Sequence, residues 1–244
     1  MKYGLVSDIH ANLEAFEAVL GALEQERVDR YVFVGDIVGY GAEPKRCLGI
    51  LKNLVKDPGC VCVAGNHDSS VCGLSGSEYY NMYARQSIYW TQRQLDDDDM
   101  KFLKQLKLVE QEDHFTVVHA NLMDPGSWGY VLDIDDAFPN FKLLDDPVCF
   151  IGHSHKPVVF TASEMVDRGM ADKITIEKGK KYIINIGSVG QPRDGNPKAC
   201  FGVYDQDAAT IEIRRVAYDV ATAQKKILDA GLPRFLAERL SLGK

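Results

Sequence analysis

Five short clusters of polar residues each follow an apolar stretch of the chain. They are Asp8-Ile9-His10, Gly35-Asp36, Gly65-Asn66-His67-Asp68, His119-Ala120-Asn121 and Gly152-His153-Ser154-His155. Aspartate, asparagine and histidine side chains together supply the mixed nitrogen and oxygen ligands that transition-metal ions bind. The clusters therefore predict a transition-metal site.

The distribution of histidine supports this interpretation. Five of the six histidines lie in the clusters, and only His114 stands apart, in a polar stretch where we expect a turn or surface residue. A single histidine on a strand is more often structural than a ligand. Burying five of them with two aspartates and an asparagine would cost several kcal/mol without partners, and bound cations are the simplest compensation.

The elements that must position these clusters alternate between strands and helices. Strands are expected at residues 3–7, 30–35 and 60–64, with helices at 13–26 and 43–55 between them. This alternation predicts a parallel sheet with covered faces. Sites in such sheets form beyond the carboxyl ends of strands, so the clusters are expected to converge on one place.

From residue 108 onward, short apolar segments separated by turn residues predict a second sheet packed on the first. The expected strands are 115–119, 148–152, 158–162, 173–177, 182–186, 199–204 and 210–215. Helices at 219–230 and 234–240 are expected to close the chain.

Residues 69–107 depart from this rhythm, and we expect them to form a helical insert in a single domain that spans residues 1–244. Four consecutive aspartates, Asp96 to Asp99, predict the N-cap and first turn of a helix. A group of aromatic residues in the insert is expected to pack between helices rather than face a substrate: Tyr79, Tyr80, Tyr83 and Trp90.

Composition excludes several functional classes. The 244 residues are 45% hydrophobic and 26% charged, as in an ordinary globular protein. The formal net charge is −7 and no Lys/Arg cluster stands out, so a long nucleic acid is not an expected partner.

No apolar run approaches the roughly 20 residues that span a bilayer, and the N-terminus lacks the pattern of a signal peptide. We therefore expect a cytoplasmic protein without a membrane partner. Its six cysteines include no C-x-x-C pair and are expected to be small buried hydrophobes. The oligomeric state is not predicted.

The ordered set D-x-H, G-D, G-N-H-D, H and G-H-x-H resembles the calcineurin-like metallophosphoesterase superfamily. Within it, the chain looks like the small bacterial and archaeal predicted phosphodiesterases. The turn at residues 185–190 extends the similarity to most of the chain. The resemblance implies an α/β fold in which a two-sheet β-sandwich is flanked by helices, in α/β/β/α layers.

The resemblance also implies a role for each matching residue. Asp8, His10, Asp36 and His155 would hold one metal ion, and Asp36 would bridge to a second ion held also by Asn66, His119 and His153. His67 would be the general acid, oriented by Asp68. The implied cofactors are two divalent transition-metal ions, with manganese expected and iron, zinc, nickel or cobalt as alternatives. The implied reaction is hydrolysis of a phosphate ester by a hydroxide that bridges the ions.

The stretch after the second motif bears on the substrate. Ser/Thr protein phosphatases of the superfamily carry Asp-Arg-Gly there, and Tyr40 stands where their phosphate-binding arginine is expected. We therefore expect a small phosphodiester or nucleotide as substrate. Dinucleoside polyphosphates, phosphomonoesters and phosphoproteins are alternatives. A protein-binding scaffold, like the retromer subunit with this fold, is a non-enzymatic alternative that the complete motif set disfavours.

Three further positions are candidates for substrate contact, each with a structural alternative. Asn12 could touch phosphate or cap the helix that follows it. Arg193 could clamp a phosphate or form a surface salt bridge. Residues 121–130 are expected to form a loop at the mouth of the site. Trp128 or Tyr130 could stack on a base there, although packing is the simpler role for Trp128.

Overall fold

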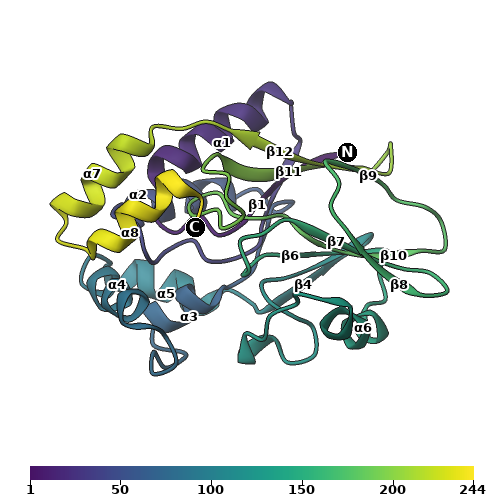
Figure 1. Ribbon diagram of the computed structural model, residues 1–244, viewed down its shortest axis with the longest axis horizontal. Helices are drawn as coiled ribbons and strands as arrows, with labels where there is room; N and C mark the ends of the chain where they lie inside the picture. Colours follow the sequence, from purple (N-terminus) through teal and green to yellow (C-terminus); the bar gives the residue numbers. More distant parts are fainter.

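Two six-stranded β-sheets pack face to face in the computed structural model, which describes all 244 residues (Figure 1). The first sheet has the order β3 (Val61–Cys62), β2 (Arg30–Phe33), β1 (Lys2–Val6), β11 (Ala199–Asp205), β12 (Thr210–Val216), β9 (Lys173–Thr175). The second has the order β4 (Val109–Glu112), β5 (Phe115–Val118), β6 (Val148–Ile151), β10 (Lys181–Asn185), β7 (Val158–Ala162), β8 (Val166–Gly169). Strands β1, β2 and β3 are parallel as predicted. Strands β11, β12 and β9 join them through antiparallel pairs and make the first sheet mixed, so the expectation that these three belong to the second sheet is wrong.

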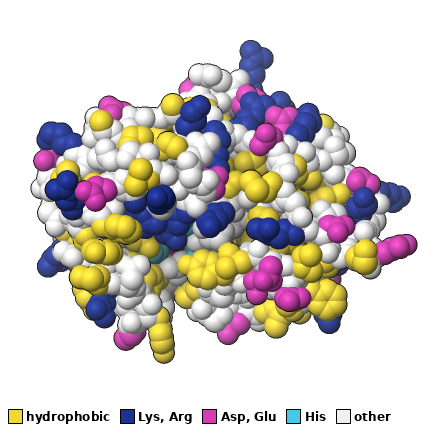
Figure 2. Space-filling model, in the orientation of Figure 1, with side chains coloured by type: hydrophobic (Ala, Val, Ile, Leu, Met, Phe, Trp, Pro, Cys, Tyr) yellow, Lys and Arg dark blue, Asp and Glu magenta, His cyan; other side chains and the backbone are white.

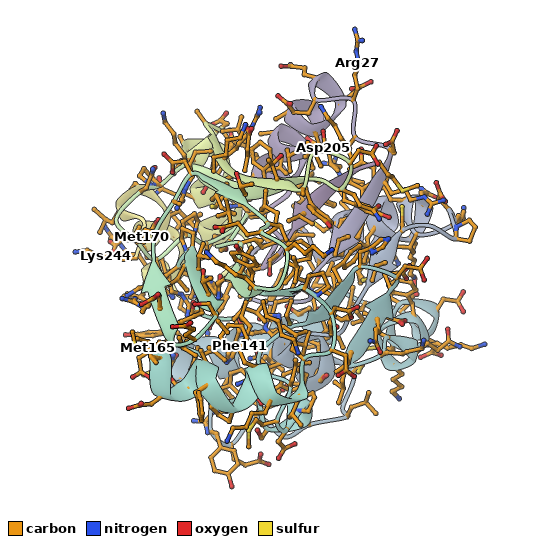
Figure 3. All side chains as sticks on the ribbon, turned by 90° about the vertical axis from the view of Figure 1, so that its right-hand side faces the viewer. Arg27, Phe141, Met165, Met170, Asp205 and Lys244 are labelled. Carbon is orange, nitrogen blue, oxygen red and sulfur yellow. The ribbon has the colours of Figure 1, made fainter.

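Helices cover the outer faces of both sheets. Helices α1 (Leu13–Gln25) and α2 (Pro44–Leu54) lie on the first sheet, and α6 (Ile134–Leu143) lies beneath the second (Figure 1). Figure 3 labels Phe141 of α6, which packs in the same core cluster as Val118 of β5. The layers are therefore α/β/β/α, and the predicted fold class is confirmed.

Alternation along the strands divides the apolar side chains between two cores. On β1, Tyr3 and Leu5 point into the space between the sheets, while Val6 points toward the helices. The ring of Tyr3 meets Phe115 of the facing sheet edge-on, with centroids 5.2 Å apart. Each such fully buried side chain contributes roughly 1.5–3 kcal/mol to stability.

The remaining helices gather at one end of the sandwich (Figure 1). They are α3 (Asn66–Val71), α4 (Met82–Gln92), α5 (Asp97–Gln105), α7 (Val220–Asp229), α8 (Arg234–Glu238) and the 3-10 turn η2 (Arg239–Leu242). A second 3-10 turn, η1 (Pro125–Ser127), lies in the connection between β5 and α6. The segment expected to be helical, residues 69–107, contains α4 and α5. The predicted aspartate cap is confirmed, because the Asp96 carboxylate accepts a hydrogen bond of 3.0 Å from the backbone N–H of Asp99.

The sequence pattern did not predict β4, β8 or α6. Strands β4 and β8 are sheet edges with no buried side chain, so they lack the apolar alternation that identifies a strand. Helix α6 contains Pro139, which disfavours a helix interior. A capping box between Asp133 and Asp136, together with burial of Phe141, outweighs that penalty.

All six cysteines are free. Four of them, Cys47, Cys72, Cys149 and Cys200, are buried as expected, whereas Cys60 and Cys62 are only half-buried, contrary to the expectation. His114 is exposed in a turn, also as expected. None of the helices is both long enough and apolar enough to cross a bilayer.

Candidate metal centre

The polar clusters meet where strands of both sheets end, and the backbone there is strained. Five cluster residues have φ angles between 49° and 66°: Asp8, His10, Asp36, His153 and His155. A residue other than glycine in this left-handed region costs on the order of 1–2 kcal/mol. Hydrogen bonds between the loops hold it, such as the one from Asp8 N–H to the Gly35 carbonyl at 3.0 Å. Strain of this kind concentrates at functional sites.

The first group of ligand atoms comes from Asp8, His10, Asp36 and His155. Each residue offers one ligand atom, these four atoms lie within 4.8 Å of one another, and all four residues are buried. The Nε2 atom of His155 lies 3.1 Å from Asp8 Oδ1 and 3.1 Å from His10 Nε2. The four donors therefore face one point.

The second group comes from Asp36, His119 and His153, again with ligand atoms within 4.8 Å of one another. Asn66 joins it, since its Oδ1 lies 3.2 Å from His119 Nε2. Asp36 belongs to both groups: its Oδ2 is 3.5 Å from His10 Nε2 and 3.4 Å from His119 Nε2. The structure thus brings all seven expected ligand residues together in two adjoining groups.

Backbone carbonyls hold three of the histidine rings with Nε2 facing inward. The three Nδ1 atoms lie within hydrogen-bond distance of carbonyl oxygens: His10 is 3.2 Å from Val38, His119 is 2.7 Å from Val34, and His155 is 2.6 Å from Gln191. A carbonyl partner places the proton on Nδ1 and leaves the lone pair of Nε2 free for a metal ion.

Uncompensated buried charge shows that cations fit this site. Asp8 and Asp36 are at most 1% exposed, and the only basic side chains within ion-pair distance of them are histidines. Burial lowers the pKa of His119, but the Asp36 carboxylate outweighs burial and brings that pKa to about 9. The two carboxylates therefore require positive charge beside them, which divalent ions supply.

Unpartnered ligand atoms support the same fit. Asp8 Oδ1 and His153 Nε2 are buried and have no hydrogen-bond partner. Burial lowers the pKa of His153 to about 3, and the nearby His119 acts in the same direction. The His153 ring is therefore neutral, which is the form that binds a metal ion.

Neighbouring residues hold the carboxylates of Asp8 and Asp36 in place. Ser7 Oγ donates to Asp8 Oδ2 at 2.6 Å, and the backbone N–H of His67 donates to Asp36 Oδ1 at 2.8 Å. A Cβ atom on Gly65 would lie 2.1 Å from Asp36 Oδ1. Only glycine at position 65 lets the loop after β3 approach this carboxylate closely.

His67 faces the cavity from outside both ligand groups. Its ring centroid lies 4.9 Å from that of His10 and 4.4 Å from that of Tyr40, and its side chain has no hydrogen-bond partner in the protein. It lines a cavity of about 170 Å³ together with Asp36 and Arg193. Burial lowers the pKa of His67 to about 4, although the Asp36 carboxylate acts in the opposite direction.

The expectation that Asp68 orients His67 is wrong. The Asp68 carboxylate accepts hydrogen bonds from the backbone N–H groups of Ile37, Val38 and Gly65 at 2.9, 3.1 and 3.0 Å, while Nδ1 of His67 has no partner. Asp68 instead ties the loop after β3 to the loop after β2. Burial and the Asp36 charge raise the pKa of Asp68 to about 7, and the three N–H donors act against them.

The predicted substrate contact of Asn12 is replaced by a structural role. Its Oδ1 accepts a hydrogen bond of 3.2 Å from the backbone N–H of Ala15, which caps α1. Its Nδ2 donates to the Gly190 carbonyl at 2.8 Å. Both ends of the amide are therefore engaged within the protein.

Arg193 faces the cavity and makes no ion pair, so the surface salt bridge considered above is not formed. Its guanidinium donates to Gln191 Oε1 at 2.9 Å and lies with its carbon 5.7 Å from the centre of the Tyr40 ring. This half-buried cation lines the same cavity as His155. An anion in the cavity would be its natural partner.

Tyr80 packs against the helical cores as predicted, and it also belongs to the site. Its hydroxyl accepts a hydrogen bond of 2.8 Å from Asn66 Nδ2, which leaves Asn66 Oδ1 directed at His119. Its ring centroid lies 5.1 Å from that of His67. The packing expectation fails for Tyr79, which is fully exposed beside the cavity.

The packing role also holds for Tyr83 and Trp90. Tyr83 stacks on Phe235 of α8 with centroids 4.8 Å apart, and both Tyr83 and Trp90 pack against the small core of α4, α7 and α8. Nothing in the sequence distinguishes these two residues from Tyr79 and Tyr80.

The two-sheet sandwich and the cluster of aspartate, asparagine and histidine at its strand ends define a metallophosphoesterase. Residues 1–209 match the calcineurin-like phosphoesterase superfamily domain. The chain belongs to that superfamily, and membership supports a phosphoric ester hydrolase that uses divalent metal ions.

Similarity to other proteins extends over almost the full length of the chain. An uncharacterised protein of Methanocaldococcus jannaschii is 40% identical over 248 positions, covering 98% of this chain and 97% of that one. The crystal structure of a metallophosphoesterase from Sphaerobacter thermophilus is 36% identical, with a TM-score of 0.88 and 100% of both chains covered. A Pyrococcus horikoshii protein shares the fold at 17% identity, with a TM-score of 0.83 over 100% of this chain and 98% of that one.

Proposed function

We propose that the protein is a two-metal phosphoesterase that hydrolyses small phosphodiesters or nucleotides. The observation that carries the proposal is the position of Asp36 Oδ2, which faces one histidine of each ligand group. A carboxylate shared in this way suits two cations held side by side, as phosphoryl transfer by two metal ions requires.

The seven ligand residues divide into two sets. Asp8, His10, Asp36 and His155 would hold one ion, and Asp36, Asn66, His119 and His153 the other. Two bound cations would acidify a water molecule to make the nucleophile and would neutralise charge on the phosphoryl oxygens. Manganese is the proposed ion, and the same ligands suit iron, zinc, nickel or cobalt.

Residues outside the ligand sets would handle the substrate. Arg193 would bind a phosphoryl oxygen and orient the ester in the cavity. His67 would protonate the leaving-group oxygen. Its ring is neutral in the free protein, and an anionic substrate beside it would raise its pKa and favour uptake of the proton that it then donates.

The size of the cavity favours a small substrate. Its volume of about 170 Å³ accommodates a phosphoryl group with compact substituents. The tyrosine at position 40 further separates the chain from the protein phosphatases that it resembles. A cytoplasmic location is part of the proposal, supported by six free cysteines, since disulfides form in oxidising compartments.

Hydrolysis of bis(p-nitrophenyl) phosphate tests the function. Protein stripped of metal and reloaded with Mn²⁺ should release p-nitrophenolate, and Asp36→Ala treated in the same way should not. A folded wild-type protein that takes up Mn²⁺ yet hydrolyses no phosphate ester would contradict the proposal.

A further inference from the structure

A second hollow adjoins the metal cavity and has aromatic walls. Its volume is about 540 Å³, and it shares five lining residues with the metal cavity: Asn66, Tyr79, Tyr80, Tyr130 and His153. Trp128 and Glu78 line only the second hollow. The face seen in Figure 2 carries a groove with histidine at its floor, Lys and Arg along one side and hydrophobic side chains along the other.

Two loops supply the aromatic walls of the second hollow. Tyr79 and Tyr80 precede α4, and Trp128 and Tyr130 follow η1. The Tyr130 ring stacks on His153, with centroids 4.1 Å apart and planes 17° from parallel. The ring centroids of Trp128 and His119 lie 6.1 Å apart. The rings of Trp128 and Tyr130 therefore pack against the two histidines of the second ligand group.

The exposure of two of these rings favours contact with a ligand over a role in the core. Tyr79 is 100% exposed and Tyr130 is 49% exposed. A fully exposed aromatic ring buries no apolar surface within the chain, yet it offers a flat apolar surface that another ring can cover.

Charge distinguishes the two hollows. The charged side chain that lines the aromatic hollow is Glu78, which makes no ion pair, whereas Arg193 lines the metal cavity. A carboxylate repels a phosphate group, and it accepts hydrogen bonds from N–H groups. The aromatic hollow therefore suits an uncharged, nitrogen-bearing ring, and the metal cavity suits the phosphoryl group.

We infer that the aromatic hollow binds the base of a nucleotide while the phosphoryl group lies in the metal cavity, so that the substrates are nucleoside phosphate esters. The inference rests on the proposed function and narrows its substrate class. A volume of about 540 Å³ lies within the range of small-molecule sites. Every base can stack on tyrosine or tryptophan, so the walls by themselves do not select one base.

Binding of AMP and ribose 5-phosphate to the Mn²⁺-loaded protein tests the inference, because both carry the sugar phosphate and only AMP carries a base. Calorimetry should give a dissociation constant at least about fivefold lower for AMP, the smallest gain that stacking on an aromatic side chain provides. Tyr79→Ala and Trp128→Ala should each bring the ratio of the two constants toward one, and Trp128→Phe should restore it.

Tyr89→Ala is the matched control, since Tyr89 is a half-exposed tyrosine of α4 that lines neither hollow. It should keep the wild-type ratio. Equal affinity for AMP and ribose 5-phosphate, with bis(p-nitrophenyl) phosphate still hydrolysed, would overturn the base site and leave the proposed function standing. A preference for AMP that survives both Tyr79→Ala and Trp128→Ala would also overturn it. Absence of both binding and hydrolysis would overturn the two proposals together.

Discussion

Arg193 lies across the ring of Tyr40, with its guanidinium carbon 5.7 Å from the ring centre. Tyr40 stands where the resembling protein phosphatases carry an arginine. The loop after β10 thus brings a cation to the cavity that the second motif itself lacks. Arg193 therefore supplies the cavity with a positive charge, although Tyr40 replaces the arginine of the protein phosphatases.

Replacing Arg193 should therefore weaken substrate binding. A hydrogen bond to a charged group contributes roughly 1.5–3 kcal/mol, so Arg193→Ala should raise KM for a diester by about tenfold or more. Arg193→Lys should recover part of the loss because it keeps the charge but not the fork of donors. Steady-state kinetics with Mn²⁺ measure both changes. A KM for Arg193→Ala within twofold of wild type would rule out the contact.

Asp36→Asn should lose more metal than any other single ligand change. The substitution removes negative charge from beside both ion positions, whereas His10→Ala or His153→Ala affects one position each. Elemental analysis after dialysis against Mn²⁺ gives the occupancy of each variant. Equal occupancy in Asp36→Asn and wild type would show that the carboxylate is not shared.

Diesters and nucleotides should be hydrolysed faster than phosphopeptides. The metal cavity of about 170 Å³ suits a phosphoryl group with compact substituents, and the arginine of the protein phosphatases is absent from position 40. A comparison of kcat/KM across the three substrate classes makes the test. Phosphopeptide turnover above that of every nucleotide and diester would reverse the assignment.

His67 should be catalytic without being a metal ligand. His67→Ala should retain its metal and lose about 10²–10⁴-fold in rate on esters with alkoxide leaving groups, which need a proton. The loss should be much smaller with p-nitrophenolate, which leaves readily unprotonated. Loss of metal in this variant, or equal slowing of both ester classes, would instead make His67 a ligand or a positioning residue.

The ligand residues were accessible from the sequence because each follows a strong apolar strand. An apolar run that stops at an aspartate or histidine marks both the strand and its end, as at Val6 and Asp8 or at Ile151 and His153. Parallel strands then bring those ends to one edge of the sheet.

Side-chain partnerships within the site were not accessible in this way. Asp68 adjoins His67 in the chain, but its carboxylate turns to three backbone N–H groups that the loop after β2 and Gly65 present. Tyr80, in the loop before α4, reaches Asn66 at the start of α3 across 14 residues of the chain. Such contacts depend on the conformations of loops, and a loop conformation has no regular residue spacing by which it could be predicted from the sequence.

Titration of metal-free protein with Mn²⁺ tests the central claim most directly. Hydrolysis of bis(p-nitrophenyl) phosphate, followed against the number of Mn²⁺ equivalents added to concentrated protein, should rise until two ions are bound per chain and then stay constant, because the two ligand groups adjoin at Asp36. Full activity in the metal-free protein, or a plateau reached at a single ion per chain, would contradict a two-metal phosphoesterase.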